Sequence, residues 1–447
     1  QSWWAMWNVW ETLLTYRHVD GPAGYKLVPG LAQSLPQISA NGKLYKFKLR
    51  PGLKYSNGAA IRASDFEFAI KRGFLAQGQG VGFYTDIAGA AAYAAHPTAS
   101  GDISGITANN AKRTITIRMA KPRGDFLTIL ALIFAAPVPA GTSPALHNGN
   151  IPASGPYRIV GYTPNRGFTM LRNRFFKPTK DIPRGNPNRV EVSLIGDANT
   201  ATQRVIGGQA DYSNGAIPPD RIASVRSRGH LLLRKTANTY YFWMNVNVAP
   251  FNKLKVRQAV NYAIDRKALQ TLVWGGLGQP TQNILPPTYP SYRKLKLYNH
   301  NVAKARQMIT AAGAKGANVT VWTREVSDAL VAAQYYTSVL NNIGLNAKLT
   351  TLPRATYYTT IGNRNTKAQT GWARWLEDYP HPLDWFDVLL NGNRITDQDN
   401  NNYAWYKNKK TDAQIESLKK APILTPAVNA RWAKTEKQIM QQAPWAP

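Results

Sequence analysis

The sequence predicts an α/β protein with more than one domain. The chain has 447 residues, which is more than a single hydrophobic core usually supports. Hydrophobic residues make up 44% of it and aromatic residues 11%, enough to build packed cores. Between residues 301 and 349, helical segments alternate with strand-like segments, which favours a largely parallel sheet with crossover helices.

The second half of the chain contains the longest predicted helices. Helices are expected at 256–273, 301–312 and 327–343, and strands at 318–322 and 345–349. Gly313 and Gly344 directly follow the last two helical segments. Glycine is the residue that most often ends a helix, so both helix ends are well marked.

The first half predicts shorter strands, turns and helices. Residues 44–49 (LYKFKL) follow an Asn-Gly turn and alternate between apolar and polar side chains, as in a half-buried strand. Ser64 is the expected N-cap of a helix, with Asp65 and Glu67 in its first turn. Further expected elements are a hairpin within 102–119, a core strand or helix within 126–138, strands at 190–195 and 231–234, and a helix at 201–207.

The chain is strongly basic. Its 55 Lys and Arg residues against 24 Asp and Glu residues give a net charge of +31. Such a charge attracts polyanions, but the basic residues are spread along the chain, whereas nucleic-acid domains concentrate them on one element. We therefore expect a basic surface suited to an anionic envelope, and no specific nucleic-acid partner. Cysteine is absent, which excludes disulfides and thiolate chemistry.

The motifs of catalysis and of metal binding are missing. No Gly-x-Ser-x-Gly segment occurs, and the six histidines are scattered without metal-ligand spacing. Residues 78–82 are glycine-rich but lack both the dinucleotide pattern and the lysine of a phosphate loop. Residues 397–408 open like a calcium loop, then place Asn402 and Asn408 where glycine and glutamate belong. We expect a protein that is not an enzyme and carries no cofactor or metal.

Five segments, in order along the chain, resemble one protein family. They are residues 31–74, residues 152–157 (PASGPY) with 171–176, residues 207–212 (GGQADY), residues 240–266 ending in NYAIDR, and residues 371–382 (GWARWLEDYPHP). Together they resemble solute-binding protein family 5, the extracytoplasmic substrate-binding proteins of peptide and nickel ABC importers, of the dipeptide- and oligopeptide-binding type.

The resemblance implies a periplasmic-binding-protein-like fold of class II, with two α/β lobes joined by a hinge and an extra α+β subdomain in the first lobe. The corresponding boundaries are 1–14 plus 150–240 for lobe I, 15–149 for the inserted subdomain, 241–442 for lobe II, and 443–447 for the start of the return hinge. Residues 238–247 would form the other hinge strand. The sequence is expected to be a fragment that lacks both ends of the family's chain.

The resemblance also implies a function. Such a protein captures a short peptide between its lobes by hinge closure and delivers it to an ABC permease in the membrane. It would be extracytoplasmic, lipid-anchored through a segment absent here, and monomeric. Two alternatives stay open: the same fold binding an oligosaccharide, a metal chelate or an anionic metabolite, and an envelope scaffold that no longer transports.

Asp378 is the first candidate for a ligand-binding residue. It lies in a segment with two prolines, which predicts a loop or strand end, and its aromatic neighbours Trp375 and Tyr379 are also candidates for ligand binding. By resemblance, its carboxylate would pair with the α-ammonium group of a peptide. A surface salt bridge or a turn cap is the alternative interpretation. Glu377 is the rival carboxylate, and Asp384 is expected to be structural.

The other candidates lie elsewhere along the chain. Trp3 and Trp4 belong to an N-terminal tryptophan cluster that either contacts the ligand or packs in a core. Trp243 and Asn245 lie on the expected hinge strand, along which a peptide would pair through its main chain. The candidates for the ligand carboxylate are Arg354, Arg364 and, less favoured, Arg324. Four aromatic residues are assigned to packing: Trp10, Phe47, Phe66 and Phe176.

Overall fold

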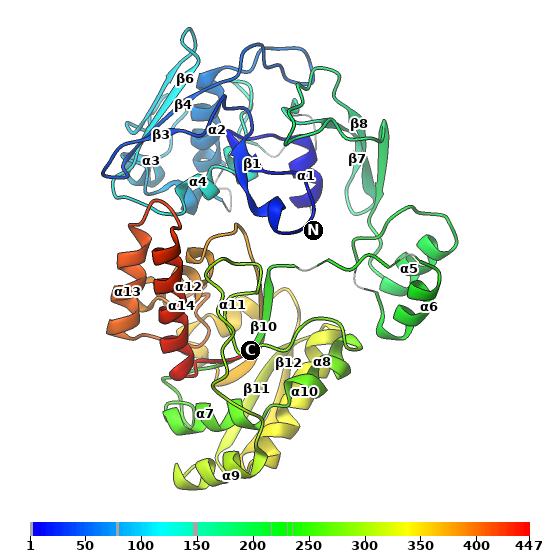
Figure 1. Cartoon of the computed structure of the whole chain (residues 1–447), viewed down its shortest axis with the longest axis vertical. Coiled ribbons are helices and arrows are strands. Elements are labelled where there is room, and N and C mark those ends of the chain that lie inside the picture. Colours follow the sequence, from blue (N-terminus) through cyan, green and yellow to red (C-terminus); the bar gives the residue numbers. More distant parts are fainter. Residues whose placement is uncertain (1–2, 77–79, 146–150, 216, 230, 235) are drawn as a thin grey trace. The chain divides into compact units, whose positions relative to one another are not determined.

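The computed structural model of the chain describes residues 3–76, 80–145, 151–215, 217–229, 231–234 and 236–447 (Figure 1). The chain divides into two compact units. Unit 1 comprises Gln1–Gly196 with Lys419–Ile423, and unit 2 comprises Asp197–Leu418 with Leu424–Pro447. Each unit has its own sheet system and its own buried cluster of apolar side chains.

Unit 1 is built from short elements. Its helices are α1 (Trp3–Val9), α2 (Ala63–Leu75), α3 (Ala90–Ala95) and α4 (Phe126–Ile129), with 3-10 turns η1 (Gly21–Tyr25), η2 (Val81–Tyr84) and η3 (Ile133–Ala135). Its strands are β1 (Leu14–Tyr16), β2 (Leu27–Pro29), β3 (Gln37–Ile38), β4 (Leu44–Lys48), β5 (Ile106–Asn109), β6 (Thr114–Arg118), β7 (Tyr157–Thr163), β8 (Gly167–Arg172) and β9 (Arg189–Ser193). They form a pair β1-β2 and antiparallel sheets β3-β4-β6-β5 and β7-β8-β9.

The strand at 44–49 and the hairpin within 102–119 are confirmed as β4 and as β5 with β6. The expected N-cap of the following helix was wrong. Helix α2 begins at Ala63, so Ser64 lies inside its first turn. The capping carboxylate belongs to Asp65, whose Oδ2 accepts a hydrogen bond from the backbone N–H of Arg62 at 2.9 Å. Burial raises the pKa of Asp65, and the hydrogen bond that its Oδ2 accepts from the Tyr55 hydroxyl at 2.9 Å partly offsets this shift.

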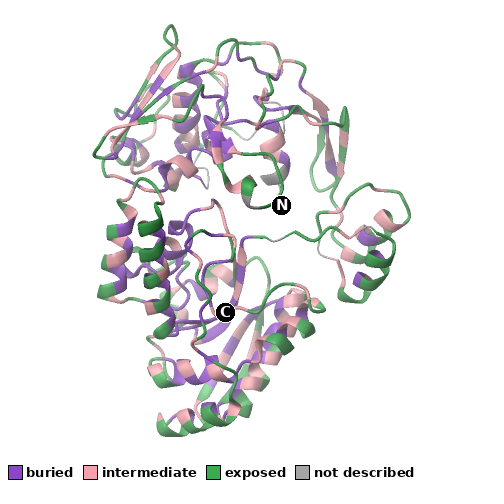
Figure 2. Ribbon diagram, in the orientation of Figure 1, coloured by how far each residue is buried: buried purple, intermediate pink, exposed green. Residues whose placement is uncertain are grey.

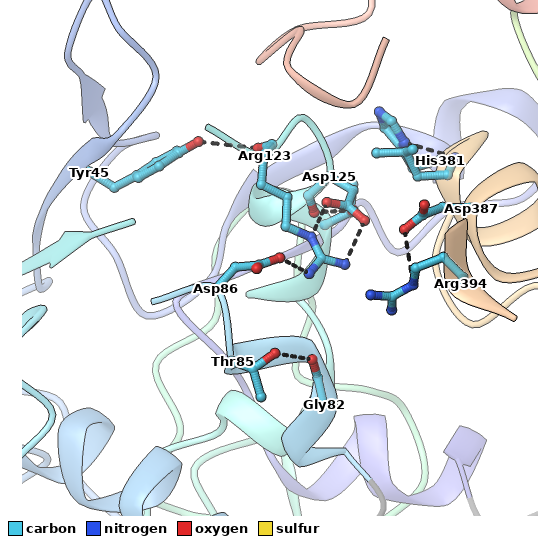
Figure 3. A network of polar contacts seen from close by, with 11 residues as sticks. Tyr45, Gly82, Thr85, Asp86, Arg123, Asp125, His381, Asp387 and Arg394 are labelled. Atoms are coloured by element: carbon cyan, nitrogen blue, oxygen red, sulfur yellow. Dashed lines mark hydrogen bonds and ion pairs between the residues drawn. The ribbon is translucent and has the colours of Figure 1, made fainter. Parts of the chain in front are cut away.

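A buried arginine fixes the middle of unit 1. The Arg123 guanidinium contacts Asp86 through Nη1 at 2.7 Å and Asp125 through Nε at 2.6 Å (Figure 3). Asp125 is fully buried, and Tyr45 donates its hydroxyl to the Arg123 carbonyl at 3.4 Å. A buried ion pair of this kind holds its partners in one geometry because losing either charge leaves the other uncompensated. The segment that carries η2 is therefore tied to α4 and β4.

Unit 2 contains one five-stranded sheet covered by helices on both faces. Its strands are β10 (Asn238–Met244), β11 (Asn318–Arg324), β12 (Asn346–Leu352), β13 (Thr370–Leu376) and β14 (Trp445–Ala446), in the order β12-β11-β13-β10-β14. Its helices are α5 (Ala198–Ile206), α6 (Ile222–Ser227), α7 (Leu254–Ala263), α8 (Arg266–Trp274), α9 (Val302–Ala311), α10 (Ser327–Asn342), α11 (Tyr357–Ile361), α12 (Leu383–Leu389), α13 (Lys409–Lys419) and α14 (Pro426–Gln441), with 3-10 turns η4 (Pro219–Arg221), η5 (Arg364–Thr366) and η6 (Gly392–Arg394). Strands β11, β12 and β13 are parallel, and β10 is antiparallel to both of its neighbours.

Several predicted boundaries need correction. The expected single helix at 256–273 is two helices, because Asp265 caps a new one: its Oδ1 accepts hydrogen bonds from the backbone N–H groups of Lys267 and Ala268. Residues 231–234, expected to be a strand, have no regular structure. The helices that begin after Asn301 and end before Gly344 are confirmed as α9 and α10.

Alternation along the strands divides the core of unit 2 into two layers. Tyr241 and Trp243 of β10 pack with α11, α12, α13 and α14 on one face. Phe242 and Met244 pack with α7, α8, α9 and α10 on the other. The sheet strands are mostly buried, whereas the outer surfaces of the helices are exposed (Figure 2). Successive side chains of a strand point to opposite faces, so β10 contributes large aromatic residues to both layers.

Candidate functional site

The carboxyl ends of β11 and β13 meet at a point where the chain leaves the sheet in two directions. After β11 the chain enters α10, which belongs to one core layer, and after β13 it enters α12, which belongs to the other (Figure 1). Because β11 and β13 are adjacent and parallel, the two connections leave the sheet from the same edge and then diverge. Ligands of open α/β sheets bind at such points.

Asp378 lies at this edge, two residues beyond the end of β13. Its side chain is half-buried, and its carboxylate has no hydrogen-bond or ion-pair partner among the residues that the structure describes. Burial raises the pKa of Asp378 to about 6. A partly desolvated carboxylate without a cation is an unusual arrangement in a chain of net charge +31, and it is suited to an external cation.

Asp384 fixes the position of Asp378. This residue of α12 is fully buried, and its Oδ2 accepts hydrogen bonds from the backbone N–H of Asp378 at 3.0 Å and from Trp375 Nε1 at 3.1 Å. Burial, and then the negative charge of Asp378, raise the pKa of Asp384 well above its ordinary value. The structural role expected for Asp384 therefore has a physical basis: its carboxylate ties the loop after β13 to the start of α12.

The rival carboxylate already has a partner. Glu377 Oε2 accepts a hydrogen bond from the Tyr289 hydroxyl at 2.6 Å, and that hydroxyl accepts one from Trp385 Nε1 at 2.8 Å. Trp385 is fully buried and Tyr289 is 5% exposed. Glu377 is thus the outer end of a chain of hydrogen bonds that leads into the core. The Asp378 carboxylate has no hydrogen-bond donor of this kind among the described residues.

The two aromatic neighbours of Asp378 differ. Trp375 is partly exposed, and its indole nitrogen donates to Asp384, the residue that also binds the backbone N–H of Asp378. Tyr379 is 2% exposed and packs inside unit 2. The structure therefore brings Trp375 and Asp378 together at the surface and directs Tyr379 inward.

The expected hinge-strand residues are engaged within unit 2. Trp243 is fully buried in a core layer, and Asn245 is 3% exposed, with its Nδ2 donating to the Ala368 carbonyl at 2.9 Å. The expectation of an open strand edge along 243–247 was wrong. Strand β10 pairs with β13 on one side and β14 on the other, and the N–H groups of Asn245 and Val246 are bound to other loops. No ligand backbone can pair there.

The remaining candidates are exposed, or their side chains lie outside the described residues. Trp3 and Trp4 begin α1, and their side chains lie outside the described residues. Arg354 is exposed. Arg364 is exposed too, contacts Asp397 at 2.5 Å and lies over the Trp405 ring at 4.8 Å. Three of the four residues assigned to packing, Phe47, Phe66 and Phe176, are confirmed, each 3% exposed.

Arg324, the least favoured arginine, has the most distinctive environment. It is the last residue of β11 and is only 7% exposed. Its Nη1 donates to the Tyr358 hydroxyl, while its Nε has no hydrogen-bond partner among the described residues. No carboxylate of the described chain forms an ion pair with it. The sequence named Arg324 only as one of three candidates, because its burial and its place at a strand end are not revealed by composition.

Neither a metal-binding cluster nor a membrane-spanning helix is found among the residues that the structure describes. Among the described residues, no group of three or more His, Asp or Glu side chains is arranged to hold a metal ion. Within the same residues, none of the helices combines the length and the apolar character needed to cross a membrane.

Comparison with solved structures identifies the architecture. The chain is similar to clavulanic acid biosynthesis oligopeptide binding protein 2, with a TM-score of 0.87 and 24% identity over 99% of this chain and 84% of that one. It is also similar to the ABC transporter-associated periplasmic binding protein DppA from Helicobacter pylori in complex with the peptide STSA, with a TM-score of 0.77, 19% identity, and coverage of 98% and 86%. The fold is that of the two-lobed, class II periplasmic binding proteins.

Sequence comparison gives the family. The family model described as bacterial extracellular solute-binding proteins, family 5 Middle, matches residues 26–397, and the chain belongs to this family. It is 27% identical to the glutathione-binding protein GsiB of Escherichia coli strain K12, over 94% of this chain and 80% of the relative. It is 21% identical to the oligopeptide-binding protein OppA of Bacillus subtilis strain 168, over 89% and 76%. These relatives are binding proteins, and a binding role follows for this chain.

Proposed function

We propose that this protein captures short peptides for an ABC importer, with the ligand's α-ammonium group at Asp378 and its carboxylate at Arg324. The proposal includes closure of the two lobes around the peptide, delivery to a membrane permease, an extracytoplasmic location and a monomeric state. The observation that carries it is a pair of opposite charges at one edge of the unit 2 sheet, neither of which has a counter-charge among the described residues.

Both charges have the environment that ligand recognition requires. Asp378 is half-buried without a cation, and Arg324 is buried without a carboxylate within the described residues. A desolvated charge without a partner destabilises a protein, so it is retained where a ligand supplies the counter-charge. A zwitterionic ligand supplies both at once. Sugars offer neither charge, which is why a peptide fits this edge better than an oligosaccharide.

The spacing of the two groups supports a small ligand. Continuing the register Trp322↔Gly371 places Arg324 level with Ala373, five residues before Asp378. At about 3.3 Å per residue, the strand direction separates them by at most about 17 Å. An extended peptide of up to about five residues covers that span. The ligands named for the two relatives, glutathione and oligopeptides, are of this kind.

Native mass spectrometry of the purified protein, followed by calorimetric titration, tests the proposal. We expect co-purified masses that fragment as short peptides, and binding of unmodified di- to pentapeptides. A co-purified sugar or metal chelate would instead support the alternative of a non-peptide ligand. Retention of full affinity for peptides that are both N-acetylated and C-terminally amidated would refute charge recognition at either end.

A further inference from the structure

Unit 1 contains an apolar cavity that the proposed peptide site does not use. Its volume is about 230 Å³, and its walls come from α2, η2, η3 and the end of α1. Ile70, Val81, Ile133 and Val138 supply the apolar surface. For scale, a dry cavity of about 150 Å³ accommodates benzene. The space in unit 1 is therefore large enough for one aromatic ring with a short chain.

The polar side chains among the described lining residues are all hydrogen-bond donors or cations. They are Trp10, Arg72 and Tyr84. Tyr84 is 2% exposed, and neither its hydroxyl nor the indole nitrogen of Trp10 has a partner in the part of the chain that the structure describes. A buried donor without an acceptor costs free energy, which an acceptor on a ligand would recover.

Arg72 adds a positive charge to this wall. Its Nε donates to the Ser143 carbonyl at 3.0 Å, and burial lowers the pKa of its guanidinium. Within the described residues, its terminal nitrogens have no carboxylate partner. The cavity thus combines an apolar body with two neutral donors and one cation, and none of the described residues that line it is acidic.

The wall is held in place before any ligand arrives. Thr85 donates its hydroxyl to the Gly82 carbonyl at 3.1 Å, and the next residue, Asp86, binds Arg123 (Figure 3). These contacts fix the turn that carries Val81 and Tyr84. A Cβ at Gly80 would lie 2.3 Å from the Phe134 ring, so glycine is needed for this ring to pack against the turn. A preformed wall reduces the entropic cost of binding.

We propose that this cavity is a second binding site, in unit 1, for a small carboxylic acid with an aromatic or similarly apolar body. The ring occupies the space beside Ile70 and Val81, and the carboxylate accepts hydrogen bonds from Tyr84, Trp10 and Arg72. Charge-assisted bonds to a guanidinium are the strongest of these, so the acid is preferred over its neutral amide. The inference does not depend on peptide binding in unit 2.

Calorimetric titration with 3-phenylpropionate, and with 3-phenylpropionamide as its uncharged counterpart, tests this site. We expect the acid to bind at least fivefold more tightly than the amide. Arg72→Gln should remove that preference, and Tyr84→Phe should weaken the acid about threefold to tenfold. Gly73 lines the cavity, and a Cβ there meets only Val81, at an ordinary 3.6 Å, so we expect a leucine side chain at this position to extend into the cavity. Gly73→Leu should abolish binding, while Gly73→Ala keeps it.

The outcomes separate this site from the one proposed in unit 2. Asp378→Asn should leave 3-phenylpropionate binding unchanged, and Gly73→Leu should leave peptide binding unchanged. The inference is overturned if the acid does not bind, if Gly73→Leu still binds it with thermal stability like that of Gly73→Ala, or if Asp378→Asn abolishes its binding.

Discussion

Replacing Asp378 by asparagine keeps the shape of the side chain and removes its charge. The wild-type carboxylate is half-buried and has no partner within the described chain, so water solvates its exposed part and a ligand would supply its counter-charge. Truncating one member of a buried charge pair costs about 2–5 kcal/mol of binding free energy. Because Asp378 is only half-buried, we expect the lower part of that range, about 2–3 kcal/mol, or a roughly 30- to 160-fold increase in Kd.

The pH dependence of peptide affinity tests the role of Asp378 independently. The pKa of Asp378 is raised to about 6 in the ligand-free protein, and an ammonium group binds its ionised form. Protonation competes below that pH, so affinity should fall about tenfold between pH 7 and pH 5. Asp378→Asn should remove this dependence. Since a raised carboxyl pKa means that ionisation opposes folding, the ligand-free variant should also melt at a higher temperature than wild type near pH 7.

Isothermal titration with an unmodified tripeptide is the assay, and Glu377→Gln is the matched control. Glu377 adjoins Asp378 but is bound by the Tyr289 hydroxyl, so its replacement should change Kd less than about threefold. Unchanged affinity in Asp378→Asn would refute the reasoning. A loss confined to Glu377→Gln would show that the anchor had been assigned to the wrong carboxylate.

Three further predictions concern positioning and stability. Asp384→Ala should lower the free energy of unfolding by about 1–3 kcal/mol in urea titrations, because Trp375 and Asp378 lose their buried acceptor. Unchanged stability would argue against the role of Asp384 in positioning Asp378. Trp243→Ala should cost about 3–5 kcal/mol of stability, since the side chain is fully buried. A variant that is as stable as wild type but does not bind peptide would instead indicate that Trp243 contacts the ligand. Burial raises the pKa of Glu436 to about 7 in the folded protein. The contribution of this group to stability is therefore present below pH 4.5 and is lost as the pH rises through 7. Glu436→Gln should flatten that part of the plot of unfolding free energy against pH, and an unaltered plot would contradict the prediction.

The α/β core of unit 2 could be predicted because its signals are local. Gly313 and Gly344 end α9 and α10, and β-branched residues mark β11. The split between α7 and α8 was missed because Asp265 was read as a helical residue, although its side chain caps the second helix. Likewise, Asp65 rather than Ser64 caps the start of α2, and the sequence offers both residues without showing which carries the hydrogen bond.

The candidate site could be predicted less completely, because burial and pairing are long-range properties. Asp378 became a candidate through the resemblance of residues 371–382 to the family, and its prolines indicated only a loop or strand end. Nothing local shows that Tyr379 points inward while Trp375 stays partly exposed, or that β14 returns to pair with Trp243. Arg324 gains its importance from lying at a strand end beside β13, which is a consequence of strand order.

Pairing Asp378→Asn with acetylation of the peptide's amino group tests the central claim most directly. In the wild-type protein, acetylation should weaken binding by about 2–3 kcal/mol, and in the variant it should have almost no further effect, because the two changes remove the same interaction. Equal losses in both proteins would contradict the account, since they would show that the ammonium group is recognised somewhere other than Asp378.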